Sequence, residues 1–160
     1  RVETAAMCAG RLFVAASGEL FVYDPQDDGS LRCTLTVPRI AREKREMRQL
    51  LPVPEWGVLL AVTDGPVHVL TLSTCEPLDQ VPNSKGCVVA AADPSTGLLC
   101  CAQKRQLHLY LWRPEGLREI KTVSAPESVR TLFWSAAGVL AVLTKRAAYL
   151  HRAPLDESAA

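Results

Sequence analysis

The chain has 160 residues and a formal net charge of +1, with 48% hydrophobic and 22% charged residues. This length favours one domain with a substantial core, and the composition excludes an intrinsically disordered chain. The near-zero charge argues against a nucleic-acid-binding protein, because such proteins normally carry a clear basic excess. No apolar run approaches the ~18 residues that a membrane helix needs. The chain begins with Arg1, not Met, and we expect it to be an excerpt of a longer protein.

Four segments of the chain repeat one pattern, in which an apolar strand, a tight turn and a second apolar strand follow one another. The second turn residues of these segments are Gly18, Gly65, Arg105 and Arg146, at intervals of 47, 40 and 41 residues. Such spacing is typical of the four-stranded blade of a β-propeller, which takes ~40–45 residues. The sequence therefore predicts an all-β chain that forms a β-propeller with about four blades.

Further strands are expected on both sides of these hairpins. An additional strand is predicted before each hairpin, at residues 2–8, 47–51, 87–92 and 129–134. An outer strand is predicted after the first three hairpins, at residues 31–37, 75–78 and 117–123. Three units then have four strands, and the fourth lacks its outer strand. Ser17-Gly18 and Asp64-Gly65 are dipeptides typical of turns. The one helix candidate is the charged segment 41–51, with a charged loop leading into a strand at Met47 as the alternative, and residues 156–160 are expected to fray.

The cysteines and histidines do not have the spacing of a metal site. No C-x-x-C pair is present, and no histidine lies at zinc-finger spacing from a cysteine. We expect six independent, reduced thiols of an intracellular protein. These are Cys8, Cys33, Cys75, Cys87, Cys100 and Cys101. His68, His108 and His151 each fall on the third strand of a different unit, which places them too far apart to share one metal ion.

Catalytic signatures are missing as well. The sequence has no nucleophile elbow, no phosphate-binding glycine loop, no dinucleotide-binding fingerprint and no zinc-protease helix motif. We therefore expect no enzyme, no cofactor and no small-molecule substrate. A rival hypothesis is a small propeller enzyme that uses His68 or His108, although these residues indicate no substrate class.

Basic residues are the candidates for partner binding. Lys104-Arg105 and Lys145-Arg146 occupy the same hairpin turn of consecutive units, so a propeller places both pairs on one face. A second cluster lies between the first two units and consists of Arg39, Arg42, Lys44, Arg45 and Arg48. Such patches suit an acidic protein surface or anionic lipids. The alternative is that they are solvated turns and a soluble connector.

The third and fourth units resemble the citron homology (CNH) domain family. The segment 98–112, LLCCAQKRQLHLYLW, is similar to a strand pair of that family, with a basic dipeptide before an alternating strand that ends in Tyr-x-Trp. Lys85-Gly86 resembles the residues that lead into this unit, and segments 7–23 and 129–150 resemble other blades. Within the family, the N-terminal domains of the vacuolar protein sorting 39 type and the TGF-beta receptor-associated type are the most similar. The fourth unit departs from the family where Ala147-Ala148 follows the basic pair, and a full domain has about seven blades.

The resemblance implies residues 1–155 as the N-terminal part of a CNH propeller in a vesicle-tethering subunit. It implies a non-enzymatic role in transport and fusion between endosomes and the vacuole or lysosome, within a HOPS-type complex. The partners implied are other tethering subunits and a Rab-type GTPase, with peripheral contact to an acidic membrane and a location in the cytoplasm at the late endosome or lysosome. The alternative is the CNH regulatory domain of a Rho-pathway kinase or exchange factor.

Overall fold

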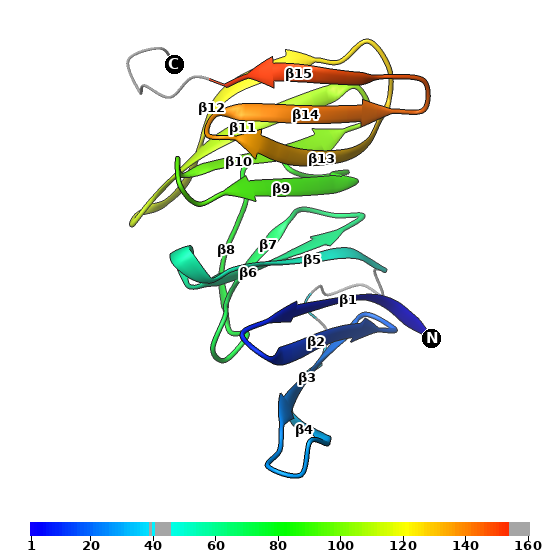
Figure 1. The fold of residues 1–160 in the computed structure, drawn as a ribbon, viewed down its shortest axis with the longest axis vertical. Coiled ribbons are helices and arrows are strands. Elements are labelled where there is room, and N and C mark those ends of the chain that lie inside the picture. The colour runs from blue at the N-terminus through cyan, green and yellow to red at the C-terminus, as the bar shows by residue number, and fades with distance from the viewer. Residues whose placement is uncertain (39, 41–45, 154–160) are drawn as a thin grey trace. The chain divides into compact units, whose positions relative to one another are not determined.

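Strands dominate the computed structural model of the chain, which describes residues 1–38, 40 and 46–153 (Figure 1). In these ranges the strands form four antiparallel sheets, and the helical structure is the single turn η1 (Pro54–Trp56). No helix within them is long and apolar enough to cross a membrane. The chain divides into two compact units, Arg1–Gln80 and Val81–Ala160. Each unit contains two sheets and is described by itself.

Unit 1 (Arg1–Gln80) contains two four-stranded sheets, in each of which neighbouring strands follow one another along the chain. The strands of the first sheet are β1 (Val2–Cys8), β2 (Arg11–Ala16), β3 (Glu19–Pro25) and β4 (Leu31–Val37). The strands of the second sheet are β5 (Met47–Val53), β6 (Val58–Thr63), β7 (His68–Thr71) and β8 (Pro77–Gln80). Two-residue turns join several of these strands. At Ser17 and Gly18 the φ angles are 55° and 76°, and positive φ at both positions matches the twist of an antiparallel hairpin.

Unit 2 (Val81–Ala160) contains one four-stranded and one three-stranded sheet. The strands of the first are β9 (Val89–Asp93), β10 (Leu98–Gln103), β11 (Gln106–Arg113) and β12 (Gly116–Ser124). The strands of the second are β13 (Val129–Ala136), β14 (Val139–Thr144) and β15 (Ala148–Arg152). The predicted pattern of three four-stranded units and one unit without its outer strand is thus confirmed for the described residues.

Of the two alternatives for residues 41–51, the helix is wrong where the structure describes these residues. The strand at Met47 is confirmed, because β5 begins there. Met47, Leu50 and Val53 are the buried residues of this strand, at a spacing of three that resembles a helix more than a strand. A β-bulge between Met47 and Gln49 explains the first of these intervals, since the extra residue places Met47 and Leu50 on the same face of the strand. The register is regular from Gln49 onward, so Val53 lies on the opposite face. Residues 41–45 and the predicted frayed tail 156–160 lie outside the described residues.

Inner strands supply the core of each unit. Every residue of β6 is buried, as are the first five residues of β10. In unit 1, Phe13 and Leu20 of the first sheet pack with Leu59 and Ala61 of the second. In unit 2, β10 and β11 pack against β13 and β14, through residues such as Leu109 and Leu140. These residues form a core between the two sheets of each unit, whereas the outer strands β4, β8 and β12 carry many exposed residues.

Polar side chains also tie the two sheets of unit 2 together. The Trp134 Nε1–H on β13 donates a hydrogen bond to the Ala91 carbonyl on β9 at 3.0 Å. Asp93, at the end of β9, accepts from the Ser95 hydroxyl at 2.6 Å, the Thr96 hydroxyl at 2.7 Å and the Gly138 N–H at 3.3 Å. Burial alone would raise the pKa of Asp93, but these hydrogen bonds outweigh it and hold the pKa below its ordinary value.

Replacing Asp93 by Asn is expected to lower the free energy of unfolding by about 1–3 kcal/mol at pH 7, because buried donors lose a charged acceptor. The folded-state pKa of Asp93 is lowered, so the stabilisation is complete above its ordinary pKa of 3.8 and is lost as the pH falls through the folded-state value. Urea unfolding of both proteins at pH 7 and pH 3 measures this. An equal difference at the two pH values would contradict the prediction, and Asp27→Asn, on an exposed turn, is the control.

Candidate interaction surface

The first basic turn of unit 2 joins β10 to β11. Its two residues, Lys104 and Arg105, lie between the paired residues Gln103 and Gln106, and both side chains are exposed. The turn is anchored to the following connection, because Ala125 N–H donates to the Arg105 carbonyl at 2.7 Å. Arg105 Nε–H in turn donates to the Ala125 carbonyl at 3.3 Å. The backbone that carries these two cations is therefore fixed on both sides.

The second basic turn joins β14 to β15 and carries Lys145 and Arg146, both exposed. Thr144 organises it from within, since its hydroxyl oxygen accepts hydrogen bonds from the N–H groups of Arg146 at 3.4 Å and Ala147 at 3.2 Å. The Thr144 N–H also donates to the Ala147 carbonyl at 2.9 Å. Neither basic side chain takes part in these bonds, so both are available to a partner.

One residue connects the two turns. Val129, the first residue of β13, donates its N–H to the Lys104 carbonyl at 2.7 Å. The same Val129 is the strand partner of Thr144 in the β13–β14 register. The two basic pairs thus lie at the same end of unit 2, as the repeat spacing predicted. Whether they bind a partner stays a prediction.

Two basic residues that the sequence analysis did not select lie at this end as well. Arg130 follows Val129 and is exposed in a β-bulge of β13, where the register shifts between Val129 and Thr131. Lys85 is exposed in the connection that leads to β9, and this connection is held to the end of β10 by a hydrogen bond from Val88 N–H to the Ala102 carbonyl at 2.9 Å. Glu127 is the acidic side chain in the connection before β13, and it is half-buried. We call this set the basic end of unit 2: Lys85, Lys104, Arg105, Arg130, Lys145 and Arg146.

The second predicted cluster is largely beyond what the structure describes. Arg39, Arg42, Lys44 and Arg45 lie outside the described residues. Arg48 is described and lies on β5 in unit 1, with an exposed side chain. Whether this cluster binds a partner therefore stays a prediction.

The histidines occupy the third strand of their sheets, as expected: His68 is on β7, His108 on β11 and His151 on β15. His108 Nδ1 lies 2.8 Å from Glu119 Oε1, and Asn83 Nδ2 donates to the other oxygen of Glu119 at 2.8 Å. Burial would raise the pKa of Glu119, but hydrogen bonds from Asn83, His108 and Thr122 lower it. In residues 1–38, 40 and 46–153, no group of three or more His, Cys, Asp or Glu could hold a metal ion. His108 is thus part of a brace between β11, β12 and the connection before β9.

All six cysteines are free thiols. Cys75, Cys87, Cys100 and Cys101 are buried, Cys8 is half-buried and Cys33 is exposed. A side-chain hydrogen bond connects Cys87 and Cys101, but no disulfide joins them. This hydrogen bond and burial raise the pKa of Cys101, and burial also raises the pKa of Cys100. Protonated, buried thiols are poor nucleophiles, so this pair packs as part of the core.

Comparison with known proteins identifies the architecture. The chain is similar to Sqt1 from Chaetomium thermophilum, with 14% identity over 94% of this chain and 44% of that one, and a TM-score of 0.71. It is also similar to the WD40 domain of Pan2 from Neurospora crassa, with 15% identity over 92% and 49% of the two chains and a TM-score of 0.68. A third similar structure is the periplasmic gluconolactonase PpgL of Pseudomonas aeruginosa, with 14% identity over 79% and 40% and a TM-score of 0.65.

These similarities show that the chain is a partial β-propeller of about four blades. At such low identities they concern the fold alone. The chain spans less than half the length of each of these structures. No family model matches the chain, and neither does any curated protein.

The backbone of the first basic turn imposes a testable limit on substitution. Lys104 has a φ of 53°, a left-handed conformation that Asn tolerates and that β-branched residues disfavour. Lys104→Asn is therefore expected to leave the free energy of unfolding within about 0.5 kcal/mol, whereas Lys104→Val lowers it by about 1–3 kcal/mol. Urea unfolding measures both, and Lys145→Val on the other basic turn is the control. A Lys104→Val variant as stable as the original chain would contradict this prediction.

Proposed function

We propose that the chain is part of a non-enzymatic interaction module, and that the basic end of unit 2 binds an acidic surface of a partner protein. The observation that carries this proposal is the convergence of exposed cations from four separate segments. Lys85, the turn at Lys104, Arg130 and the turn at Lys145 are far apart in the sequence, yet backbone hydrogen bonds and strand pairing hold them at one end.

The way the cations are held supports binding. Both basic turns have backbones that are fixed by hydrogen bonds, whereas the side chains of Lys104, Lys145 and Arg146 are exposed. A partner therefore has to order side chains only, since the backbone needs no further ordering, and this reduces the entropic cost of association.

Charge pattern favours a protein partner over a membrane. Glu127 lies in the connection between Ala125 and Val129, and both of these residues are bonded to the first basic turn. An anionic bilayer attracts uniform positive charge, and a carboxylate among the cations weakens that attraction. A folded partner can instead place a cation opposite Glu127 and acidic groups opposite the lysines and arginines, which gives orientation as well as attraction.

The resemblance to CNH domains supports a more specific assignment. It favours a vesicle-tethering subunit that acts between endosomes and the vacuole or lysosome, at the cytoplasmic side of these membranes. The partners proposed on this basis are other tethering subunits and a Rab-type GTPase. The regulatory domain of a Rho-pathway kinase or exchange factor remains the alternative, and it would use the same surface with a different partner.

The test removes the charges while keeping the turns intact. In the test variant, Lys104→Asn, Arg105→Ser, Arg130→Gln, Lys145→Ser and Arg146→Ser are combined, with Asn at position 104 to suit its positive φ. Pull-down with purified Rab-type GTPases and tethering subunits is expected to show at least about tenfold weaker binding at 0.1 M salt. The difference should shrink at 0.5 M salt, because exposed charges are screened over a few ångströms there.

A matched control removes other exposed cations of the same unit. Arg118→Ser on β12 and Arg152→Ser at the end of β15 leave the two basic turns unchanged and are expected to bind normally. A melting curve establishes that the test variant is folded. Unchanged binding of a folded test variant would refute the proposal, and loss of binding to anionic vesicles alone would favour the membrane instead.

A further inference from the structure

Unit 1 contains an open pocket of about 430 Å³ that the proposed function does not use. It lies where the turn between β1 and β2, the segment around η1 and the turn between β7 and β8 come together, and all of its lining residues belong to unit 1. Phe13, Pro54 and Leu72 give the pocket apolar walls, and Phe13 is fully buried beneath it. The volume falls within the range of ~300–1,000 Å³ that ligand sites occupy.

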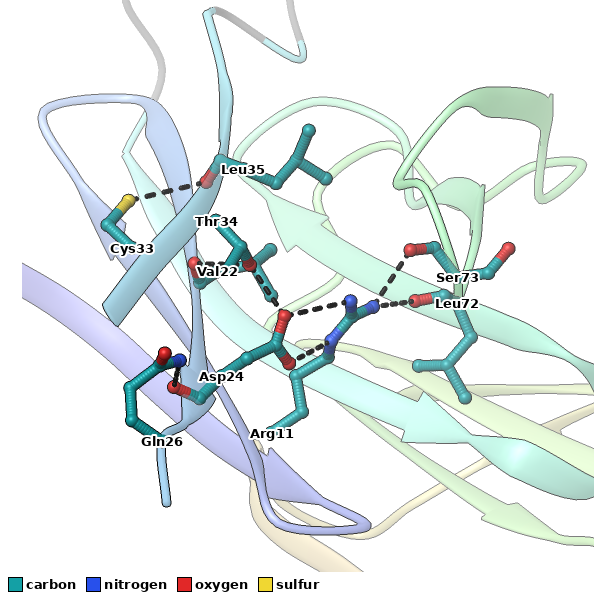
Figure 2. A network of polar contacts seen from close by, with 9 residues as sticks. All are labelled: Arg11, Val22, Asp24, Gln26, Cys33, Thr34, Leu35, Leu72 and Ser73. Carbon is teal, nitrogen blue, oxygen red and sulfur yellow. Dashed lines mark hydrogen bonds and ion pairs between the residues drawn. The ribbon is translucent and has the colours of Figure 1, made fainter. Parts of the chain in front are cut away.

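The polar wall of the pocket carries no net charge. Arg11 Nε–H and Nη2–H donate to the two oxygens of Asp24 at 2.8 Å and 3.2 Å, and Arg11 Nη1–H donates to the Ser73 carbonyl at 2.8 Å (Figure 2). The Thr34 hydroxyl also donates to Asp24, at 2.6 Å. The hydrogen bond to Asp24 raises the pKa of Arg11, and that from Arg11 lowers the pKa of Asp24, so both stay charged and cancel each other. The pocket thus offers nothing that would select an ion.

The rim of the pocket is open. Ala9, Pro54, Gly57 and Ser73 are exposed there. Gly57 has a φ of 66°, and a Cβ atom at this position would meet nothing within 4 Å. A free small molecule normally binds with 70–90% of its surface buried. A pocket this open can surround only one end of its ligand, and the rest of the ligand must extend past the rim.

We propose that this pocket binds an uncharged apolar side chain, of the size of leucine or phenylalanine, presented by a partner polypeptide. The side chain would lie against Phe13 and Leu72, and the partner's backbone would pass the exposed rim. Asp24 holds the Arg11 side chain in place, and Arg11 connects the first sheet to the β7–β8 turn through the Ser73 carbonyl. This site is separate from the basic end of unit 2, so either proposal can fail without the other.

The thiol of Cys8 allows binding in the pocket to be measured by chemical labelling. It is half-buried and lines the pocket, whereas Cys33 is exposed on β4 and does not. The reduced chain is equilibrated with disulfides in which cysteamine is joined to a phenethyl, isobutyl or hydroxyethyl thiol. The Cys8 thiolate attacks the probe disulfide, a new S–S bond forms to the probe, and cysteamine leaves and takes up a proton. Peptide mapping by mass spectrometry then reports the occupancy of each cysteine.

Cys8 is expected to retain the phenethyl and isobutyl probes about tenfold more than the hydroxyethyl probe, because burying such a group is favourable by at least this factor. Cys33 should retain all three similarly. Ser73→Trp fills the rim without removing the carbonyl that Arg11 uses, and it should abolish the preference at Cys8. Glu76→Trp, an exposed residue outside the lining, should leave it unchanged. Equal retention at Cys8, or a preference that survives in a folded Ser73→Trp protein, would overturn the proposal.

A second measurement distinguishes a polypeptide from a free small molecule. NMR titration of the ¹⁵N-labelled chain uses the capped tripeptides Ac-Ala-Leu-Ala-NH₂, Ac-Ala-Phe-Ala-NH₂ and Ac-Ala-Ser-Ala-NH₂, together with toluene. Shifts of the amide signals of Cys8, Gly57 and Ser73 are expected with the leucine and phenylalanine peptides and not with the serine peptide. Shifts with toluene alone would contradict the polypeptide partner. This titration does not involve the cations of unit 2.

Discussion

Burial of the inner strands on both faces is the constraint from which the other features follow. Every residue of β6 is buried, and β10 is buried at all but its last residue. A strand that is apolar on both faces needs hydrogen-bonded neighbours at its edges and cover above and below. The chain meets the first need with four-stranded meanders. Packing of the two sheets within each unit covers one face of each inner strand, through residues such as Leu59 and Ala61 of β6 and Leu98 and Cys100 of β10. Neither β6 nor β10 accordingly contains a charged residue.

Antiparallel pairing determines which turns lie together at one end of a sheet. Successive strands run in opposite directions, so every second turn of a meander lies at the same end of the sheet. In unit 2 this rule places the turns at Lys104 and Lys145 together with the connections that precede β9 and β13. In unit 1 it places the β1–β2 and β7–β8 turns beside η1, and these form the pocket. Both candidate sites are consequences of the same topology.

Several charged groups away from the basic end connect separate segments of the chain. Asp93 ties the end of β9 to the turn at Gly138, and Arg11 joins the first sheet of unit 1 to the carbonyl of Ser73 in the second. Glu119 links His108 to Asn83. Each of these groups has several partners, as a desolvated charge requires.

The sequence alone determined the strands, the turns and the repeat, because alternation, turn dipeptides and spacing are local properties that survive without tertiary contacts. It also placed the pairs at Lys104 and Lys145 on one face, since that follows from the repeat. Tertiary structure alone decided the rest. Arg130 joined the surface through a β-bulge, and a similar bulge placed Met47 and Leu50 on the same face of β5. The pocket depends on Arg11 and Ser73, which are 62 residues apart. Contacts of this kind cannot be predicted from local sequence patterns, because they form only when two sheets pack and bring distant turns together.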